Sequence, residues 1–190
     1  MYLRKLELHD APLMLEWMHD PEISRFFRAD FASMTLHDAE NFIAHSTKLT
    51  PDNSINAAVS SDDGTYMGTV SLKHIDFSRG DAEFAIVMRR AAHGQGFAWY
   101  GMREIIAGAF RDLKLSLVWW NVLRVNHRAV RFYEKHNFSE MMSVPDEFTR
   151  YYEDTQKFRW YSVVSPMTDE NSKFIMATGN RLTLSLLNFL

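Results

Sequence analysis

The sequence predicts an α/β (α+β) fold in which a mixed, mostly antiparallel central sheet is flanked by helices. Three β-rich runs, at 55–60, 66–75 and 82–88, are separated by turn residues and indicate an antiparallel meander. Segments with apolar residues at helical spacing precede and follow this meander. With 190 residues, 46% of them hydrophobic, the chain is long enough to bury the core of one such domain.

The other elements follow from local signals. Asp10 is a good helix N-cap and Pro12 suits a first turn, so a helix is expected to run to about residue 19. Thr35, with Asp38 as its acidic partner, marks the start of a second helix. Further strands are expected at 2–8, 115–120, 139–144 and 156–164, and further helices at 98–109 and 126–136.

The domain organisation is expected to be simple. Residues 1–165 are predicted to form one domain, and residues 166–190 a C-terminal tail. The tail begins with a polar run and ends in closely spaced leucines, a pattern that fits an added strand, an oligomer contact or a poorly ordered end. A homodimer is therefore one of the open possibilities.

The composition argues against several classes of protein. A net charge of −3 disfavours nucleic-acid binding, which needs a positive excess. The absence of cysteine excludes disulfides, Cys-ligated metal sites and a Cys nucleophile, and the eight histidines lack metal-binding spacings, so no metal is predicted. No apolar run approaches the roughly 20 residues of a membrane helix, and the N-terminus is charged where a secretory signal is apolar. We expect a cytoplasmic protein with neither a membrane nor a nucleic-acid partner.

Two glycines, Gly94 and Gly96, lie where a strand ends and a helix begins. A helix N-terminus carries unpaired N–H groups and partial positive charge, and glycine lets the backbone approach an anion closely. Arg89, Arg90 and His93 add positive potential, so the turn predicts a diphosphate site, with a tight turn that binds nothing as the alternative. The Rossmann pattern fails because Trp99 occupies the place of its third glycine, and no P-loop Lys-Ser/Thr follows.

The segment from Asn126 to Phe138 resembles the pattern Asn-x-x-Ala-x-x-x-Tyr-x-Lys-x-Gly-Phe of the GNAT superfamily of acyl-CoA N-acetyltransferases. The glycine turn resembles the CoA-binding loop of that superfamily, and the resemblance covers about residues 1–164. It looks closest to the branch with ribosomal-protein N-terminal and aminosugar acetyltransferases. Two positions depart from the pattern: Ala91 stands where the family has Gln or Arg, and Asn137 replaces a glycine, although Asn also accepts left-handed geometry.

The resemblance implies acetyl-CoA as the cofactor. At about 100° per residue, Asn126, Ala129 and Tyr133 share one helical stripe, which would place two polar side chains over the sheet. The residues implied to bind the cofactor are Val87, Met88, Arg89, His93, Gly94, Gln95, Gly96, Phe97, Ala98, Asn126 and Tyr133. With Ala91 in the place of the usual Gln or Arg, the contact to the pyrophosphate is assigned first to the backbone of the loop.

The resemblance also implies catalytic roles. Tyr133 would protonate the departing sulfur, because a phenol of pKa about 10 and a thiol of about 8.5 are close enough for efficient transfer. Asn126 would hydrogen-bond the cofactor or a water, and a backbone N–H at the end of the preceding strand would contact the thioester carbonyl. Glu83, on that strand, is a candidate base, with a solvated residue or an ion pair as the alternative; His74 is a lesser candidate.

The acceptor is predicted to be a primary amine. By resemblance, Phe27 and Arg28, between the first two helices, and Trp120, at the end of a strand, would line its pocket, although core filling is an alternative. A small molecule such as an aminosugar nucleotide is placed slightly ahead of a peptide N-terminus, and a polyamine also fits an acidic chain. A rival of another class is an acyl-CoA-binding module without turnover.

Overall fold

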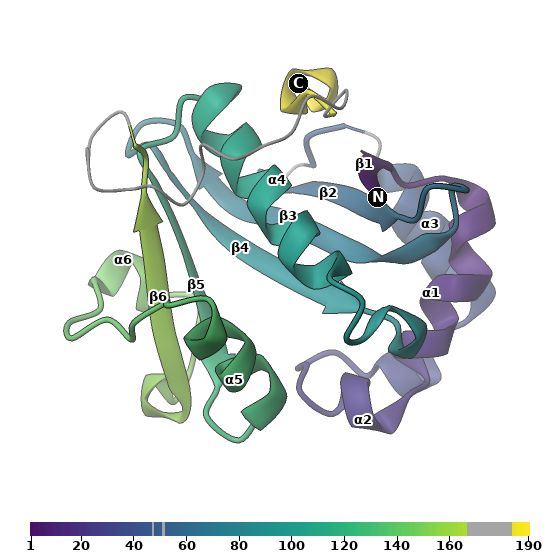
Figure 1. Ribbon diagram of the computed structural model, residues 1–190, viewed down its shortest axis with the longest axis horizontal. Coiled ribbons are helices and arrows are strands. Elements are labelled where there is room, and N and C mark those ends of the chain that lie inside the picture. The colour runs from purple at the N-terminus through teal and green to yellow at the C-terminus, as the bar shows by residue number, and fades with distance from the viewer. Residues whose placement is uncertain (47, 51, 167–183) are drawn as a thin grey trace.

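A six-stranded sheet forms the centre of the computed structural model, which describes residues 1–46, 48–50, 52–166 and 184–190 (Figure 1). The strands are β1 (Tyr2–Lys5), β2 (Ile55–Ser60), β3 (Tyr66–Asp76), β4 (Asp81–Met88), β5 (Leu117–Leu123) and β6 (Phe158–Val164). They lie in chain order, and neighbours pair antiparallel except β4 and β5, which run parallel. The predicted fold class is confirmed.

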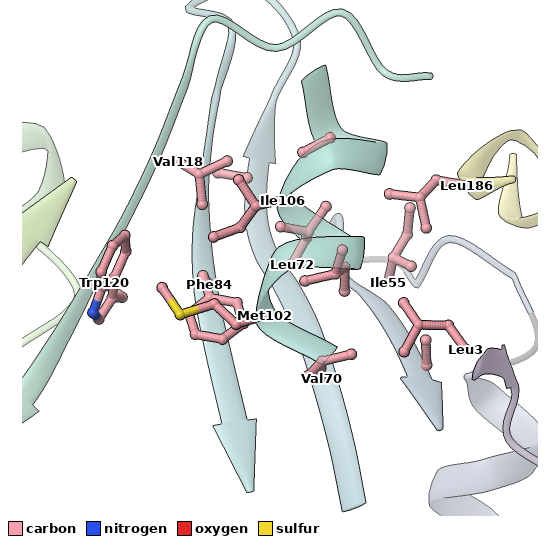
Figure 2. Close-up of a cluster of buried hydrophobic side chains, with 14 of the residues drawn as sticks. Leu3, Ile55, Val70, Leu72, Phe84, Met102, Ile106, Val118, Trp120 and Leu186 are labelled. Carbon is pink, nitrogen blue, oxygen red and sulfur yellow. The ribbon is translucent and has the colours of Figure 1, made fainter. Parts of the chain in front are cut away.

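Helices cover both faces of the sheet (Figure 1). They are α1 (Ala11–Met18), α2 (Pro21–Ser24), α3 (Leu36–His45), α4 (Phe97–Arg111), α5 (His127–Lys135) and α6 (Asp146–Thr149). Helix α4 crosses one face and connects β4 to β5, which allows these two strands to run parallel. Figure 2 shows Leu72 and Phe84 of the sheet against Met102 and Ile106 of α4, all fully buried. Helices α1 and α3 pack on the other face in a second cluster.

Strands β4 and β5 are paired over only part of their length. Residues 81–83 pair with residues 117–119. Beyond that point β4 continues to Met88 and β5 to Leu123 without further pairing between them. The sheet therefore splits along the second half of β4.

The β3–β4 hairpin contains an irregularity that decides which side chains lie beside Glu83. Asp76 pairs with Asp81, and an uninterrupted register would then pair Lys73 with Phe84. The register instead shifts by one residue, so that Lys73 pairs with Glu83, and His74 within the shift has a φ of 49°. Because directly paired residues share a face of the sheet, Lys73 and Glu83 lie on the same face.

Two local predictions for the N-terminal half have different outcomes. Thr35 caps α3 as predicted, in a reciprocal capping box with Asp38. Asp10 precedes α1, but its side chain does not cap that helix. Its carboxylate is fully buried and accepts hydrogen bonds from Arg4 at 2.6 and 2.7 Å and from the backbone of Glu7 at 2.9 Å, which leaves the cap unmade.

The strand predicted at 139–144 is wrong. This segment is a loop, and the backbone bond of Met141 N to Trp160 O, at 2.8 Å, ties it to the edge of β6. Met142 is fully exposed and Pro145 follows directly as the N-cap of α6, so the segment has neither a buried face nor room to continue. The predicted strand at 2–8 also ends early, at Lys5.

The described end of the tail, residues 184–190, belongs to the main core. A 3₁₀ turn at Leu186–Phe189 buries both of its end residues against α4 and the sheet (Figure 2). Leu49 N donates to Phe189 O at 2.6 Å, and Leu186 N donates to Asp112 at 2.8 Å. Residues 167–183 lie outside the described residues.

Candidate active site

A cavity of about 1140 Å³ opens where β4 and β5 diverge. Phe84 and Tyr133 line it from the side of the sheet that α4 covers, and Glu83 and Asn121 from the opposite side. The split in the sheet thus joins its two faces in one cavity. Of the residues predicted to bind the cofactor, the cavity is lined by Val87, Met88, His93, Gly94, Gly96, Ala98, Asn126 and Tyr133.

The glycine turn has the geometry expected of an anion-binding helix start. Gly94 and Gly96 have φ values of 76° and 86°, in the left-handed region that favours glycine. The first intrahelical bond of α4 runs from Tyr100 N to Gly96 O, at 3.0 Å. The N–H groups of Phe97 and Ala98 therefore have no acceptor within the helix. Phe97 and Gln95, also predicted to bind the cofactor, are not among the residues that line the cavity.

The cation beside the turn is not the one predicted. Arg89 is bound to Glu16 at 2.5 and 2.9 Å and to Tyr66 O at 3.1 Å, and it does not line the cavity. The prediction that Arg89 contacts the cofactor is therefore corrected, because its side chain is bound elsewhere. Arg128 of α5 lines the cavity instead, with its Nη1 2.7 Å from Nδ1 of His93. Burial, and then Arg128, lower the pKa of His93, so His93 adds little positive charge at neutral pH.

Tyr133 is buried at the α5 side of the cavity. Its ring packs against Tyr161 and Trp120, with centroids 5.1 and 5.5 Å away. Burial, with a smaller contribution from Tyr161, raises the pKa of Tyr133, so the hydroxyl keeps its proton at neutral pH. Asn126 and Ala129, which the sequence places on the same stripe, line the cavity together with Tyr133. Asn126 is the N-cap of α5, and its Oδ1 accepts from Ala129 N at 3.2 Å. Asn137 has a φ of 61°, in agreement with the left-handed geometry expected there.

Glu83 lies on the opposite face and is buried, with 4% of the residue exposed. The hydroxyl of Tyr152 donates to its Oε1, while Oε2 has no hydrogen-bond partner among the described residues. His74 Nε2 is 3.6 Å from that Oε2, and the His74 ring stacks on Tyr151. Burial raises the pKa of Glu83, and Lys73 and Tyr152 oppose this rise.

Of the three residues predicted to line the acceptor pocket, two line the cavity and one does not. Phe27 and Arg28 line the cavity on the side of Glu83. Trp120 does not, because it points to the other face and is fully buried in the main core (Figure 2), so its predicted role is corrected. Its neighbour Asn121 takes that place, as expected from the alternation of side chains along a strand.

Tyr152 and Lys73 are the residues that sequence reasoning missed on this face. Tyr152 lies in the loop before β6, far from either motif, and no sequence pattern announces it. Lys73 depends on the register shift in the β3–β4 hairpin, which the turn residues alone do not predict.

Two further structural findings bear on the predictions. No described helix is long and apolar enough to cross a membrane. Within the described residues, no group of three or more His, Asp and Glu side chains could hold a metal ion.

The chain is similar to known acetyltransferases in sequence and fold. It is 26% identical over 119 residues to an uncharacterized N-acetyltransferase p20 from Bacillus licheniformis, a match covering 61% of this chain and 66%, just under two thirds, of that protein. A spermidine N-acetyltransferase from Vibrio cholerae, in complex with CoA and spermine, has a similar fold (TM-score 0.67, 21% identity, 85% of this chain and 94% of that one). A probable acetyltransferase is also similar (TM-score 0.68, 21% identity, 87% and 93%).

The sequence model of the acetyltransferase (GNAT) domain family matches residues 1–139, which is most of the chain. Enzymes of this family take the acetyl group from acetyl-CoA, in agreement with the predicted cofactor and enzyme class. The chain belongs to the GNAT acetyltransferase family.

Proposed function

We propose that this protein transfers the acetyl group of acetyl-CoA to the primary amine of a small molecule, in the cavity between β4 and β5. One observation carries the proposal. Glu83 and Tyr133, a candidate base and a candidate acid on opposite faces of the sheet, line the same cavity. Acetyl transfer needs a proton removed on one side of the reacting carbon and supplied on the other.

The residues along this cavity fit acetyl-CoA. The turn at Gly94 and Gly96 offers backbone N–H groups and the start of α4 to the pyrophosphate, and Arg128 supplies a cation beside them. Val87 and Met88 lie on the stretch of β4 that is not paired with β5, so that edge can receive the pantetheine arm. When bound, acetyl-CoA supplies the thioester whose C–S bond breaks as the C–N bond forms.

Glu83 is suited to take the proton of the amine. Its Oε2 has no hydrogen-bond partner among the described residues, while Oε1 is held by Tyr152. Burial moves the pKa of Glu83 toward neutral pH, where a general base works best. The positive charge of Lys73 helps to keep the carboxylate ionised. His74 at 3.6 Å is placed to pass the proton on toward solvent.

Tyr133 is suited to hold the proton that the departing sulfur needs. Its Oη donates no hydrogen bond within the described residues, and burial keeps it protonated. The same burial raises the pKa of a thiol beside it, so the two groups stay matched. Asn126 adds its amide NH₂, since its Oδ1 is used by the helix cap.

The acceptor is proposed to be a small molecule. Phe27, with a side chain 39% exposed, and Arg28 lie over the side of the cavity that holds Glu83. An aminosugar nucleotide is one such small-molecule amine, and a polyamine like the spermine bound to the Vibrio cholerae enzyme is another. A peptide N-terminus is the second candidate and is decided by the same assay.

The test is release of free thiol from acetyl-CoA in the presence of a panel of amines and short peptides. We expect turnover with at least one amine, and thermal stabilisation by CoA alone. Stabilisation without turnover on any acceptor would favour a binding module, and no stabilisation at millimolar CoA would reject the cofactor site. Tyr133→Phe is the matched variant: it should lose turnover while keeping the CoA-induced shift.

A further inference from the structure

Two cations, Arg28 and Lys73, line the cavity on the side of Glu83 without a carboxylate partner among the described residues. We infer that they bind an anionic group, a phosphate or a carboxylate, on the same molecule whose amine is acetylated. The inference rests on the proposed function and narrows its substrate class. The acceptor is then an amine with a nearby negative charge rather than a simple polyamine.

Arg28 is held next to the pair formed by Glu83 and Tyr152. Its guanidinium lies 5.1 Å from the centre of the Tyr152 ring, and its Nη1 donates to Tyr151 O at 3.4 Å. The hydroxyl of Tyr152 is bound to Glu83. One aromatic ring thus places the cation and the candidate base on the same side of the cavity.

Lys73 reaches the same place from the sheet. The register shift at His74 pairs it directly with Glu83 on the same face. Its positive charge opposes the rise in the pKa of Glu83 caused by burial, which agrees with a short separation. No ion pair joins the two side chains, so the ammonium group is available to a ligand that sits between Glu83 and Arg28.

Two other pairs of opposite charges on this side of the cavity form salt bridges. Arg25 is paired with Glu22 at 3.1 Å, and Lys157 with Asp154 at 2.6 Å. The remaining carboxylate, that of Glu153, is at an exposed position. Arg28 and Lys73 thus lie on the same side of the cavity as the buried Oε2 of Glu83, which has no hydrogen-bond partner among the described residues.

This distribution of charge has opposite consequences for two kinds of amine. Arg28 and Lys73 together provide donors suited to phosphate or carboxylate oxygens, and such charge-assisted bonds are the strong ones. A polyamine would instead bring further ammonium groups toward two cations that form no salt bridge with a described carboxylate. The amine that reaches Oε2 of Glu83 is therefore favoured when an anion accompanies it.

The experiment compares acceptors that differ in one anionic group, with acetyl-CoA and detection of free thiol. The pairs are lysine with cadaverine, for a carboxylate, and glucosamine 6-phosphate with glucosamine, for a phosphate. We expect kcat/KM to be at least about tenfold higher for the anionic member of one pair, from a charge-assisted bond. The pair that shows the effect identifies the anion. Equal values in both pairs, or a preference for cadaverine and glucosamine, would overturn the inference while the proposed function stands.

Variants make the test specific to the two cations. Arg28→Gln and Lys73→Gln should each raise the KM of the anionic acceptor by about 10–100-fold, the loss of one charge-assisted bond, and this rise should exceed the change seen with its uncharged or cationic counterpart. The assay is run above the acid limb of the pH profile, because Lys73 also affects Glu83. Arg25→Gln is the control: it removes the same charge from a residue already paired with Glu22.

A binding measurement decides the matter if no acceptor turns over, which is the failure of the proposed function. Glucosamine 6-phosphate and lysine are added to the protein saturated with CoA, so that the pyrophosphate site is filled. Stabilisation of the wild type that is lost in Arg28→Gln supports the anion site, and equal behaviour of the two proteins rejects it.

Discussion

Tyr152 should set the pH at which the enzyme works, because its hydroxyl holds one oxygen of Glu83. Tyr152→Phe removes that hydrogen bond and keeps the aromatic ring next to Arg28. A hydrogen bond to a charged group contributes about 1.5–3 kcal/mol. One pKa unit corresponds to about 1.4 kcal/mol, so the loss of this hydrogen bond should raise the pKa of Glu83 by about 1–2 units.

The direction in which the pH profile moves follows from the role of Glu83 as base. The hydrogen bond stabilises the ionised carboxylate, so removing it favours the protonated form, which cannot accept a proton. The acid limb of kcat/KM against pH should move about 1–2 units higher. Activity should fall at neutral pH and recover at alkaline pH.

The assay is free-thiol release measured across pH for wild type, Tyr152→Phe, Glu83→Gln and the double variant. In the Glu83→Gln background, Tyr152→Phe should have little further effect, because the carboxylate that it acts on is gone. An acid limb that does not move, or a full additional loss in the double variant, would refute the link between these two residues.

Three other predictions address the acid, the buried carboxylate and the C-terminus. Tyr133→Phe should lower kcat by about 10²–10⁴-fold with an unchanged thermal shift by CoA, and unaltered turnover would remove Tyr133 as the acid. Because burial raises the pKa of Glu83, ionisation costs no stability below its unfolded pKa and destabilises the protein as pH rises through the folded pKa. The melting temperature of Glu83→Gln relative to that of the wild type should therefore rise with pH between the unfolded and the folded pKa of Glu83 and level off above them, and a difference that stays constant across this range would contradict this. Leu186→Ala should destabilise by about 2–5 kcal/mol in denaturant unfolding, whereas Leu187→Ala, at a position 55% exposed, should have little effect; similar losses for both would contradict the packing of the C-terminal turn.

Much of the fold could be predicted because its signals are local. The strand at 55–60 matches β2, and the capping box at Thr35 starts α3 as expected. The loop at 139–144 was misjudged because its residues favour a strand, while Pro145 and the lack of a buried face prevent one. Asp10 does not cap the helix because its carboxylate is bound to Arg4, six residues earlier.

The residues of the candidate site that lie within the two motifs could be predicted. Those whose position depends on packing between distant parts of the chain could not. Gly94, Gly96 and Tyr133 line the cavity as the two motifs imply. Arg89 pairs with Glu16, 73 residues away in sequence, and no pattern in the sequence reports such a contact. Lys73 requires a one-residue register shift, which local sequence does not determine.

The most direct test of the central claim is an experimental structure of the protein with CoA and an acceptor amine. We expect the CoA sulfur to lie between β4 and β5, at hydrogen-bonding distance from Tyr133 Oη, with the amine nitrogen facing Oε2 of Glu83. A sulfur remote from Tyr133, or an amine bound on the same face of the sheet as Tyr133, would contradict it.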